Sequence, residues 1–409
     1  MKKITRRSFL TVCGAVAAAA ALSGCAPAGS ACVGNGFSDW LKQTFGKDSA
    51  ASSESAEAAA PDAGTPDAGA ASEPPAESAD TSLPAYNADP LTGEPRRSNG
   101  RMVGVMVNNI SNTQRQNARP QRGIGSADLL IESKVEGGIS RFCAVYYDAN
   151  AIPEVGPLRS GRDQFLQLLM PWQALYYHDG ESAPCTKFIN VYNYSGLNIG
   201  GKSYFNTPTH PHVAHRDSRG RNVAYEHTEF TSGAEIRKAA ANAGIGLQYP
   251  YESTFFRFAD YRTGAENKMS GAAAAKTINI VHSDSYKTTF SYNRWDHLYK
   301  MSMYSRAAGA FENTVDELTG KQLGFTNLLV CFAGIADYPG NSGGVQQVDY
   351  VGGEAYFFTR GAVQRGTWQK ASPEHPLKVY AADGSEICFN RGKTYLALVD
   401  NDEWSNFSY

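Results

Sequence analysis

The chain has 409 residues, of which 42% are hydrophobic and 19% are charged, with 38 Lys and Arg against 40 Asp and Glu. A nucleic-acid-binding domain would carry clustered Lys and Arg on a basic surface. The sequence has no such cluster, so we expect no nucleic-acid partner.

Residues 1–24 are predicted to be a lipoprotein signal peptide. A positively charged end with adjacent Arg6 and Arg7 precedes an apolar run that closes with Leu22-Ser23-Gly24-Cys25. Cleavage before a cysteine whose sulfur carries diacylglycerol leaves acyl chains that partition into a bilayer, so Cys25 is the predicted lipidation site. We therefore expect an extracytoplasmic protein whose membrane partner is reached through this lipid.

The same segment suggests a route of export. Its Thr-Arg-Arg-x-Phe-Leu core is similar to a twin-arginine signal, which indicates export of the folded protein; an ordinary secretory signal with two arginines is the alternative. The apolar run is too short for a lasting transmembrane helix, because spanning needs roughly 20 apolar residues.

Residues 25–88 are predicted to be a disordered tether. Most of this segment is Ala, Ser, Pro, Gly and acidic residues, so it cannot bury enough apolar surface to offset the backbone entropy of folding. As a flexible coil, the stretch from about Ala50 to Pro90 would span on the order of 35 Å. That reach suits a domain working in or on the cell wall, and a spacer that only clears the lipid headgroups is equally consistent with it.

Residues 89–250 are predicted to form an α/β domain built on a mixed sheet. Short apolar runs bounded by turn residues predict strands, at residues 102–107, 129–131, 139–147 and 174–177. Apolar residues at helical spacing predict helices, at residues 161–170 and 232–243. Ser160 is the expected N-cap of the first helix, and Pro171 is expected to end it.

Residues 251–409 are predicted to form a smaller, β-rich domain. Short alternating runs predict strands, at residues 255–258, 277–281, 288–292, 299–304, 327–332, 345–351, 354–359, 361–369, 377–380 and 393–399. Cys331 lies in one of these runs, where a free thiol behaves as a small hydrophobe. A disulfide between Cys331 and Cys388 is the pairing we would test, although sequence alone does not fix connectivity.

Several motifs carry a family resemblance: Asp89-Pro90-Leu91-Thr92-Gly93, Val105-Met106-Val107-Asn108-Asn109, Glu136-Gly137-Gly138-Ile139-Ser140-Arg141-Phe142, Gly156-Pro157-Leu158-Arg159-Ser160-Gly161-Arg162 and Arg391-Gly392-Lys393-Thr394. With them, roughly residues 89–409 resemble the YerB-like lipoprotein family, a bacterial domain of unknown function. The resemblance implies an α/β domain and a smaller β-rich domain on an exported lipoprotein, without established chemistry. The chain departs from the family at Glu226-His227-Thr228, where members tend to have Pro-His-Asn, and at Tyr395, where members often have Trp.

The sharpest site hypothesis is an anion site around the segment of residues 156–162. We expect Arg159, Ser160, Arg162 and the first N–H groups of the following helix to converge on one place, where arginine would suit a carboxylate or phosphate group. Arg141 and His227 are added as further ligand-binding candidates. The alternative is a set of internal salt bridges from these arginines to Glu132, Glu136 or Asp163.

Two weaker hypotheses involve acids and histidines. Glu132 and Glu136, with His178, are acid/base candidates for a hydrolase, but on one strand the two carboxylates would lie roughly 13 Å apart, beyond the spacing of about 5 to 9.5 Å that glycosidases use. Another hypothesis is a zinc site formed by His210 and His212, with His215 or Asp217 as a further ligand; a polar surface loop is the alternative.

The sequence therefore predicts a membrane-anchored envelope lipoprotein that binds a cell-wall polymer or a wall-synthesis protein, with no cofactor and without catalysis. An envelope hydrolase or transferase acting on a glycan or peptide is the rival class. A structural adaptor that contacts only proteins is the third.

Overall fold

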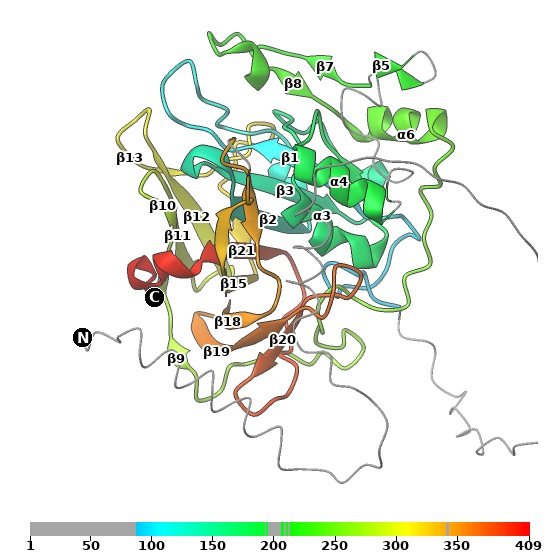
Figure 1. Cartoon of the computed structure of the whole chain (residues 1–409). Coiled ribbons are helices and arrows are strands. Elements are labelled where there is room, and N and C mark those ends of the chain that lie inside the picture. The colour runs from blue at the N-terminus through cyan, green and yellow to red at the C-terminus, as the bar shows by residue number, and fades with distance from the viewer. Residues whose placement is uncertain (1–86, 193, 195–205, 208–209, 212, 341–342) are drawn as a thin grey trace, which may run out of the picture. The chain divides into compact units, whose positions relative to one another are not determined.

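The computed structural model describes residues 87–192, 194, 206–207, 210–211, 213–340 and 343–409 (Figure 1). The predicted signal peptide, Cys25 and nearly all of the predicted tether lie outside these residues, so those statements stay predictions. Among the described residues, no helix combines the length and apolar character needed to cross a membrane.

A mixed, ten-stranded sheet forms the centre of the structure. In spatial order its strands are β20 (Lys378–Ala381), β19 (Ala362–Gln369), β18 (Gly353–Thr359), β15 (Asn327–Ala333), β21 (Thr394–Asp400), β2 (Leu129–Lys134), β3 (Ser140–Tyr146), β1 (Val103–Asn108) and β4 (Leu175–Tyr177), with β9 (Ala273–Ala274) beside β19. The central strand β21 pairs in parallel with both β2 and β15. All residues of β1, β15 and β21 are buried, which explains their largely apolar sequences.

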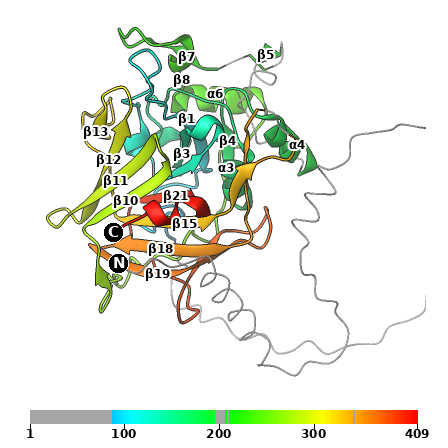
Figure 2. The ribbon, with the colours of Figure 1, turned by 60° about the vertical axis from the view of Figure 1, so that its left-hand side comes forward.

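A second, antiparallel sheet packs on the central one (Figure 2). It contains β10 (Thr277–Ser283), β11 (Tyr286–Asn293), β12 (Leu298–Ser305), β13 (Ala310–Asn313) and β14 (Gly324–Phe325). Buried and partly exposed residues alternate along β12, so one face of this five-stranded sheet points inward and the other outward. On the inner face, the ring centroid of Phe290 lies 4.8 Å from that of Tyr395 in β21.

In the described part of the chain, three α-helices complete the layers: α3 (Asp163–Leu169), α4 (Ala183–Val191) and α6 (Gly233–Asn242). The helix α3 lies directly on β1, because a Cβ atom at Gly104 would be 2.3 Å from Cδ1 of Leu169. The helix α6 packs Ile236 into the same core as Val103 and Val105, which point to the other face of β1. Consequently α3 and α6 cover opposite faces, and the five-stranded sheet shares the face of α6.

Short elements connect the larger ones. The paired short strands are β5 (Asn206–Thr207) with β6 (His210–Pro211), β7 (His215–Arg216) with β8 (Glu229–Phe230), and β16 (Ile335–Asp337) with β17 (Gln346–Val348). The 3-10 helices are η1 (Ile124–Ser126), η2 (Glu136–Gly138), η3 (Ala149–Ala151), η4 (Met170–Trp172), η5 (Tyr225–His227) and η6 (Asn401–Asn406). Two of them, η2 and η5, hold residues of the candidate site.

The fold confirms the mixed α/β class predicted from the sequence. The four strands expected in residues 89–250 correspond to β1–β4, and the second expected helix is α6, with Ser232 as its N-cap. Strands from 89–250 and from 251–409 lie in one sheet, because β2 pairs with β21.

The first predicted helix starts later than expected. Its N-cap is Arg162 rather than Ser160, and the helix begins at Asp163. The reason is long-range pairing: the N–H of Gly161 donates to the carbonyl of Gly180, and the carbonyl of Gly161 accepts from Ser182, which holds this stretch extended.

The suggested disulfide is not formed. Cys331 and Cys388 are both free thiols. Across the sheet Cys331 faces Ala355 and Leu398, whereas the segment that follows Cys388 lies beside Phe258. In the sheet, Cys331 is therefore paired with residues other than Cys388.

Candidate functional site

Three arginines gather where β3 begins and where residues 156–162 lead into α3. Arg141 donates from Nη1 to the carbonyl oxygen of Ser160 at 2.6 Å. Arg162 donates from Nε to Oε1 of Glu136 at 2.5 Å, and Nη2 of Arg141 lies 3.9 Å from Oε2 of the same carboxylate. Arg159 is close enough to interact electrostatically with both. We call Arg141, Arg159 and Arg162 the arginine cluster.

Within the residues that the structure describes, the arginine cluster has fewer ion pairs than arginines, although Glu226, Asp179 and Glu229 lie close enough to Arg159 to interact with it electrostatically. Among the described residues, Glu136 is the one carboxylate that forms an ion pair with it. Burial, reinforced by Arg162, lowers the pKa of Arg141 to about 9. Burial also lowers the pKa of Arg159, although Glu226 opposes the shift. In the described part of the chain, the Arg159 guanidinium makes no hydrogen bond and no ion pair, so it is available to an anion.

The alternative of internal salt bridges holds for one of the three acids considered. Burial opposes ionisation of Glu136, but the hydrogen bond from Arg162 outweighs it and lowers the pKa of this carboxyl. Asp163 instead accepts hydrogen bonds from Tyr338 at 2.6 Å and from Gln167 at 3.2 Å. Glu132 belongs to a separate network, described below.

Ser160 and His178 help to hold residues 156–162, the loop that carries Arg159 and Arg162. Ser160 contributes its carbonyl to Arg141, and the N–H of Arg162 at the helix start donates to the hydroxyl of Tyr176 at 2.9 Å. His178 is buried, with Nδ1 2.8 Å from the carbonyl of Gly180. The His178 ring packs closely against Gly161: a Cβ atom added at Gly161 would lie 2.9 Å from Cδ2 of His178. This enclosure argues against His178 as a solvent-exposed acid or base.

His227 lies beside the arginine cluster in a chain of polar contacts. Its Nδ1 is 2.9 Å from Nδ2 of Asn108, and its Nε2 is 2.8 Å from Oε1 of Gln116. Gln116 in turn donates to Glu226 at 3.1 Å. Burial lowers the pKa of His227 to about 4, and Arg159 contributes to the shift. The neutral ring accepts from Asn108 at Nδ1 and donates to Gln116 from Nε2.

Glu132 is fully buried between the two sheets. Its carboxylate accepts from Ser140 and Tyr395, each at 2.5 Å, and from Thr288 at 3.2 Å, while Nε2 of His282 lies 3.6 Å away. Burial opposes ionisation, but His282 and the hydroxyl donors outweigh it and lower the pKa of Glu132.

These contacts indicate that the Glu132 carboxylate stabilises the core. It is not exposed, as one of two catalytic carboxylates in a hydrolase would be. Glu136 is engaged with Arg162 instead, so the two carboxylates belong to separate networks. The geometry gives no support to paired acid/base chemistry by these residues.

Sequence patterns gave no indication of the residues that complete the Glu132 network. The side-chain amide of Asn109 donates to Oε1 of Glu132 at 3.4 Å. Arg119 in turn donates to Oδ1 of Asn109 at 3.0 Å. Asn109 stands in one of the motifs that carry the family resemblance, and that motif was the available signal. The partners of these two residues come from strands far away in the sequence.

No group of three or more His, Cys, Asp or Glu side chains within the described residues could hold a metal ion, and the zinc hypothesis for His210 and His212 stays a prediction. His212 lies outside the described residues, and the side chain of His210 is not described. His215 has Nδ1 2.9 Å from Oε1 of Glu235 and Nε2 3.1 Å from Oε2 of Glu154. Both ring nitrogens are therefore occupied by carboxylates.

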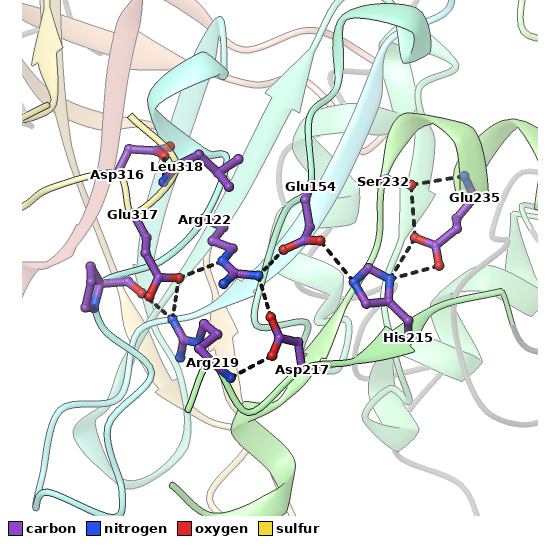
Figure 3. A network of polar contacts seen from close by, with 11 residues as sticks. Arg122, Glu154, His215, Asp217, Arg219, Ser232, Glu235, Asp316, Glu317 and Leu318 are labelled. Atoms are coloured by element: carbon purple, nitrogen blue, oxygen red, sulfur yellow. Dashed lines mark hydrogen bonds and ion pairs between the residues drawn. The ribbon is translucent and has the colours of Figure 1, made fainter. Parts of the chain in front are cut away.

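Figure 3 shows the network that extends from His215. Arg122 contacts Glu154, and it donates to Asp217 at 2.8 Å and to Glu317 at 2.7 Å. Burial opposes the charge of Arg122, but its hydrogen bonds to Glu154 and the other two acids outweigh this and raise its pKa. This carboxylate-rich network compensates its own arginines, in contrast to the arginine cluster.

Comparisons with known proteins identify relatives along most of the chain. Residues 91–246 match the family described as protein of unknown function (DUF3048) N-terminal domain, and residues 277–396 match the DUF3048 C-terminal domain. The chain is 27% identical over 332 residues to YerB of Bacillus subtilis (strain 168), a protein whose name describes it as a candidate lipoprotein; the match covers 78% of this chain and 88% of YerB.

A solved structure agrees with the fold. The crystal structure of the YerB protein from Bacillus subtilis matches with a TM-score of 0.61 at 24% identity, covering 76% of this chain and 96% of that one. Together with the matches to both halves of the family, this confirms the resemblance carried by the sequence motifs. The chain belongs to the DUF3048 family.

Proposed function

We propose that the chain is an extracytoplasmic lipoprotein, anchored through Cys25, that binds an anionic component of the cell envelope at the arginine cluster. The name of its relative and the Leu22-Ser23-Gly24-Cys25 motif support the anchor. The observation that carries the binding proposal is the guanidinium of Arg159, which forms no hydrogen bond and no ion pair within the described residues, beside Arg141 and Arg162.

Carboxylate and phosphate share the chemistry that this cluster recognises, because arginine donates paired hydrogen bonds to either group. In the envelope, peptide stems of the wall supply carboxylates and anionic wall polymers supply phosphates. Binding does not require an acid or base, and it agrees with the enclosure of Glu132 and His178.

The test is co-sedimentation of the chain from residue 26 onward with purified cell walls, before and after chemical removal of the anionic polymers. We expect Arg159→Gln to weaken binding roughly ten-fold or more, since a hydrogen bond to a charged group contributes about 1.5–3 kcal/mol. Arg262→Gln is the matched control, because Arg262 is paired with Asp260 on the surface.

The outcomes separate the sources of the anion. Binding that disappears with the polymers identifies phosphate, and binding that persists identifies peptide carboxylates. Equal binding by wild type, Arg159→Gln and Arg262→Gln contradicts the proposal. Release of soluble wall fragments supports the hydrolase class instead.

A further inference from the structure

The outer face of the five-stranded sheet carries a depression that the arginine cluster does not use. It has a volume of about 480 Å³ and lies at the end of the β11–β12 hairpin, where Tyr292, Trp295, Asn313 and Gln322 line it. This volume is within the range of about 300–1,000 Å³ of small-molecule sites. Its lining is mostly amide, hydroxyl and aromatic, which are groups that recognise sugars, together with the cations Arg294 and Lys300.

Trp295 is the aromatic surface of this depression. It is 80% exposed, although a tryptophan in an ordinary surface position would bury most of its large apolar ring. The turn that carries it is fixed, since its N–H donates to Oδ1 of Asn293 at 2.9 Å. The guanidinium of Arg294 lies 4.4 Å from the ring centroid, a cation–π contact that favours this orientation of the ring. A held, exposed indole is suited to stack on the apolar face of a sugar ring.

Beside Trp295, hydrogen bonds orient two amides. Gln322 donates from Nε2 to the carbonyl of Met301 at 2.8 Å and to Oδ1 of Asn313 at 3.2 Å, and Ser302 donates to the same Oδ1 at 3.1 Å. Within the described residues, Nδ2 of Asn313 and Oε1 of Gln322 have no hydrogen-bond partner. One fixed donor and one fixed acceptor match a sugar hydroxyl, which both donates and accepts.

The two cations of the lining both interact with neighbouring residues. Lys300 is paired with Asp296 at 2.6 Å, and Arg294 is stacked on Trp295. The lining also lacks the aliphatic anchors that a protein partner's apolar side chain would need. With Lys300 ion-paired and Arg294 stacked on the indole, the indole and the two amides suit a polyhydroxylated, uncharged molecule.

The same face extends far enough for a chain of sugars. Lys300, Ser302 and Tyr304 point outward from β12 because side chains alternate along a strand. Tyr304 forms an aromatic pair with Phe311 of β13, with ring centroids 5.7 Å apart, and Phe311 is 50% exposed. From Lys300 to Tyr304 the strand rises about 13 Å, so aromatic surfaces lie at both ends of a polar row.

We propose that this outer face, with Trp295, Asn313 and Gln322 at its centre, binds a neutral glycan chain. It is a site separate from the arginine cluster, on the other segment of the chain. The probes are chitohexaose and cellohexaose, two uncharged oligosaccharides, titrated into the chain from residue 26 onward by isothermal calorimetry and by NMR.

We expect wild type to bind at least one probe and Trp295→Ala to bind it roughly two- to ten-fold more weakly. This range corresponds to the energy of one aromatic contact. Trp295→Phe should recover part of the affinity, and Asn313→Ala should weaken it as well. Tyr225→Ala is the matched control: Tyr225 is 71% exposed and is stacked by Arg216 at 3.8 Å, but it lies outside the depression.

If neither probe binds at millimolar concentration, the proposal is overturned. Equal affinity of wild type and Trp295→Ala for a probe that binds also overturns it. Arg159→Gln distinguishes this site from the anion site, because it should leave oligosaccharide binding unchanged. Unchanged thermal unfolding of Trp295→Ala excludes misfolding as the cause of a lost signal.

Discussion

Glu132 shows how a single buried charge can join two sheets. Its ligands come from β3, β11 and β21, so one carboxylate satisfies hydroxyl donors from segments far apart in the sequence. A buried charge is tolerated only when hydrogen bonds and opposite charge replace water. The side chain that first suggests acid/base chemistry is therefore explained by the core it stabilises.

We expect Glu132→Ala to lower the free energy of unfolding by on the order of 3–5 kcal/mol, because it leaves buried donors without an acceptor. Glu132→Gln keeps the shape and should cost less. Urea unfolding followed by circular dichroism measures both. Glu252→Ala, at an exposed position, is the control and should change stability by less than about 0.5 kcal/mol. An unchanged midpoint for Glu132→Ala contradicts this account.

His227 predicts a pH dependence with a definite sign. Burial lowers its pKa from 6.5 to about 4 in the folded state, so between these values the unfolded chain binds more protons than the folded one. Stability is therefore fully present above about pH 6.5 and is lost as the pH falls towards 4, by on the order of 2–3 kcal/mol. Unfolding free energies at pH 7 and pH 4.5 should show this loss in wild type and a smaller one in His227→Gln.

His215 provides the opposite case as a control. Burial opposes its charge, but Glu235 and Glu154 outweigh burial and raise its pKa. Its contribution is present below pH 6.5 and is lost as the pH rises through the folded value. Relative to wild type, His215→Gln should therefore differ most at acidic pH. Equal acid sensitivity of wild type and His227→Gln contradicts the assignment of the neutral ring.

At the scale of elements, the site depends on how one loop is held against two strands. Residues 156–162 lie between β1 and the segment of Gly180: the N–H of Arg159 donates to Met106, and its carbonyl accepts from Asp179. The loop is thus pinned on both sides before α3 begins. This explains why three arginines stay together despite their mutual repulsion.

The sequence correctly predicted the strands that are marked by short apolar runs bounded by turn residues. The runs at 102–107 and 139–147 are strands because their residues are buried on both faces or nearly so. The predicted start of α3 was wrong. Ser160 is a residue type that often caps helices, but pairing of its neighbour Gly161 with residues 180–182 keeps this stretch extended. The motif with Arg159 and Arg162 was enough to suggest the candidate site.

Long-range partners were beyond the reach of the sequence pattern. Nothing in the run at 393–399 indicates that it pairs with β2, about 260 residues earlier in the chain. The same holds for Arg122, whose acids are scattered over the chain (Figure 3). Contacts of this kind depend on topology, which a single sequence does not specify.

At the scale of the whole molecule, the two family segments interlock. The strand β21, from the second segment, lies between β2 of the first segment and β15 of its own. Arg122 of the first segment pairs with Glu317 of the second, and Arg119 donates to the carbonyl of Tyr304 at 2.8 Å. The anion site and the glycan face are therefore carried by one continuous core.

This interlocking predicts that residues 89–250 do not fold cooperatively alone. Without the second segment, β2 loses its parallel partner, Glu132 loses the hydroxyls of Tyr395 and Thr288, and the inner face of the central sheet loses its cover. Urea unfolding and amide NMR dispersion of this fragment should show a broad transition and collapsed signals, whereas residues 87–409 should unfold in one sharp step.

Mixing fragments 89–250 and 251–409 provides the control for this prediction, because pairing of β2 with β21 should restore dispersion in the mixture if the fragments are competent but incomplete. A sharp transition of 89–250 by itself would contradict the prediction. It would show that β1–β4 with α3 and α6 bury enough apolar surface to form a domain, and residue 250 would then divide two independent folding units within a shared sheet.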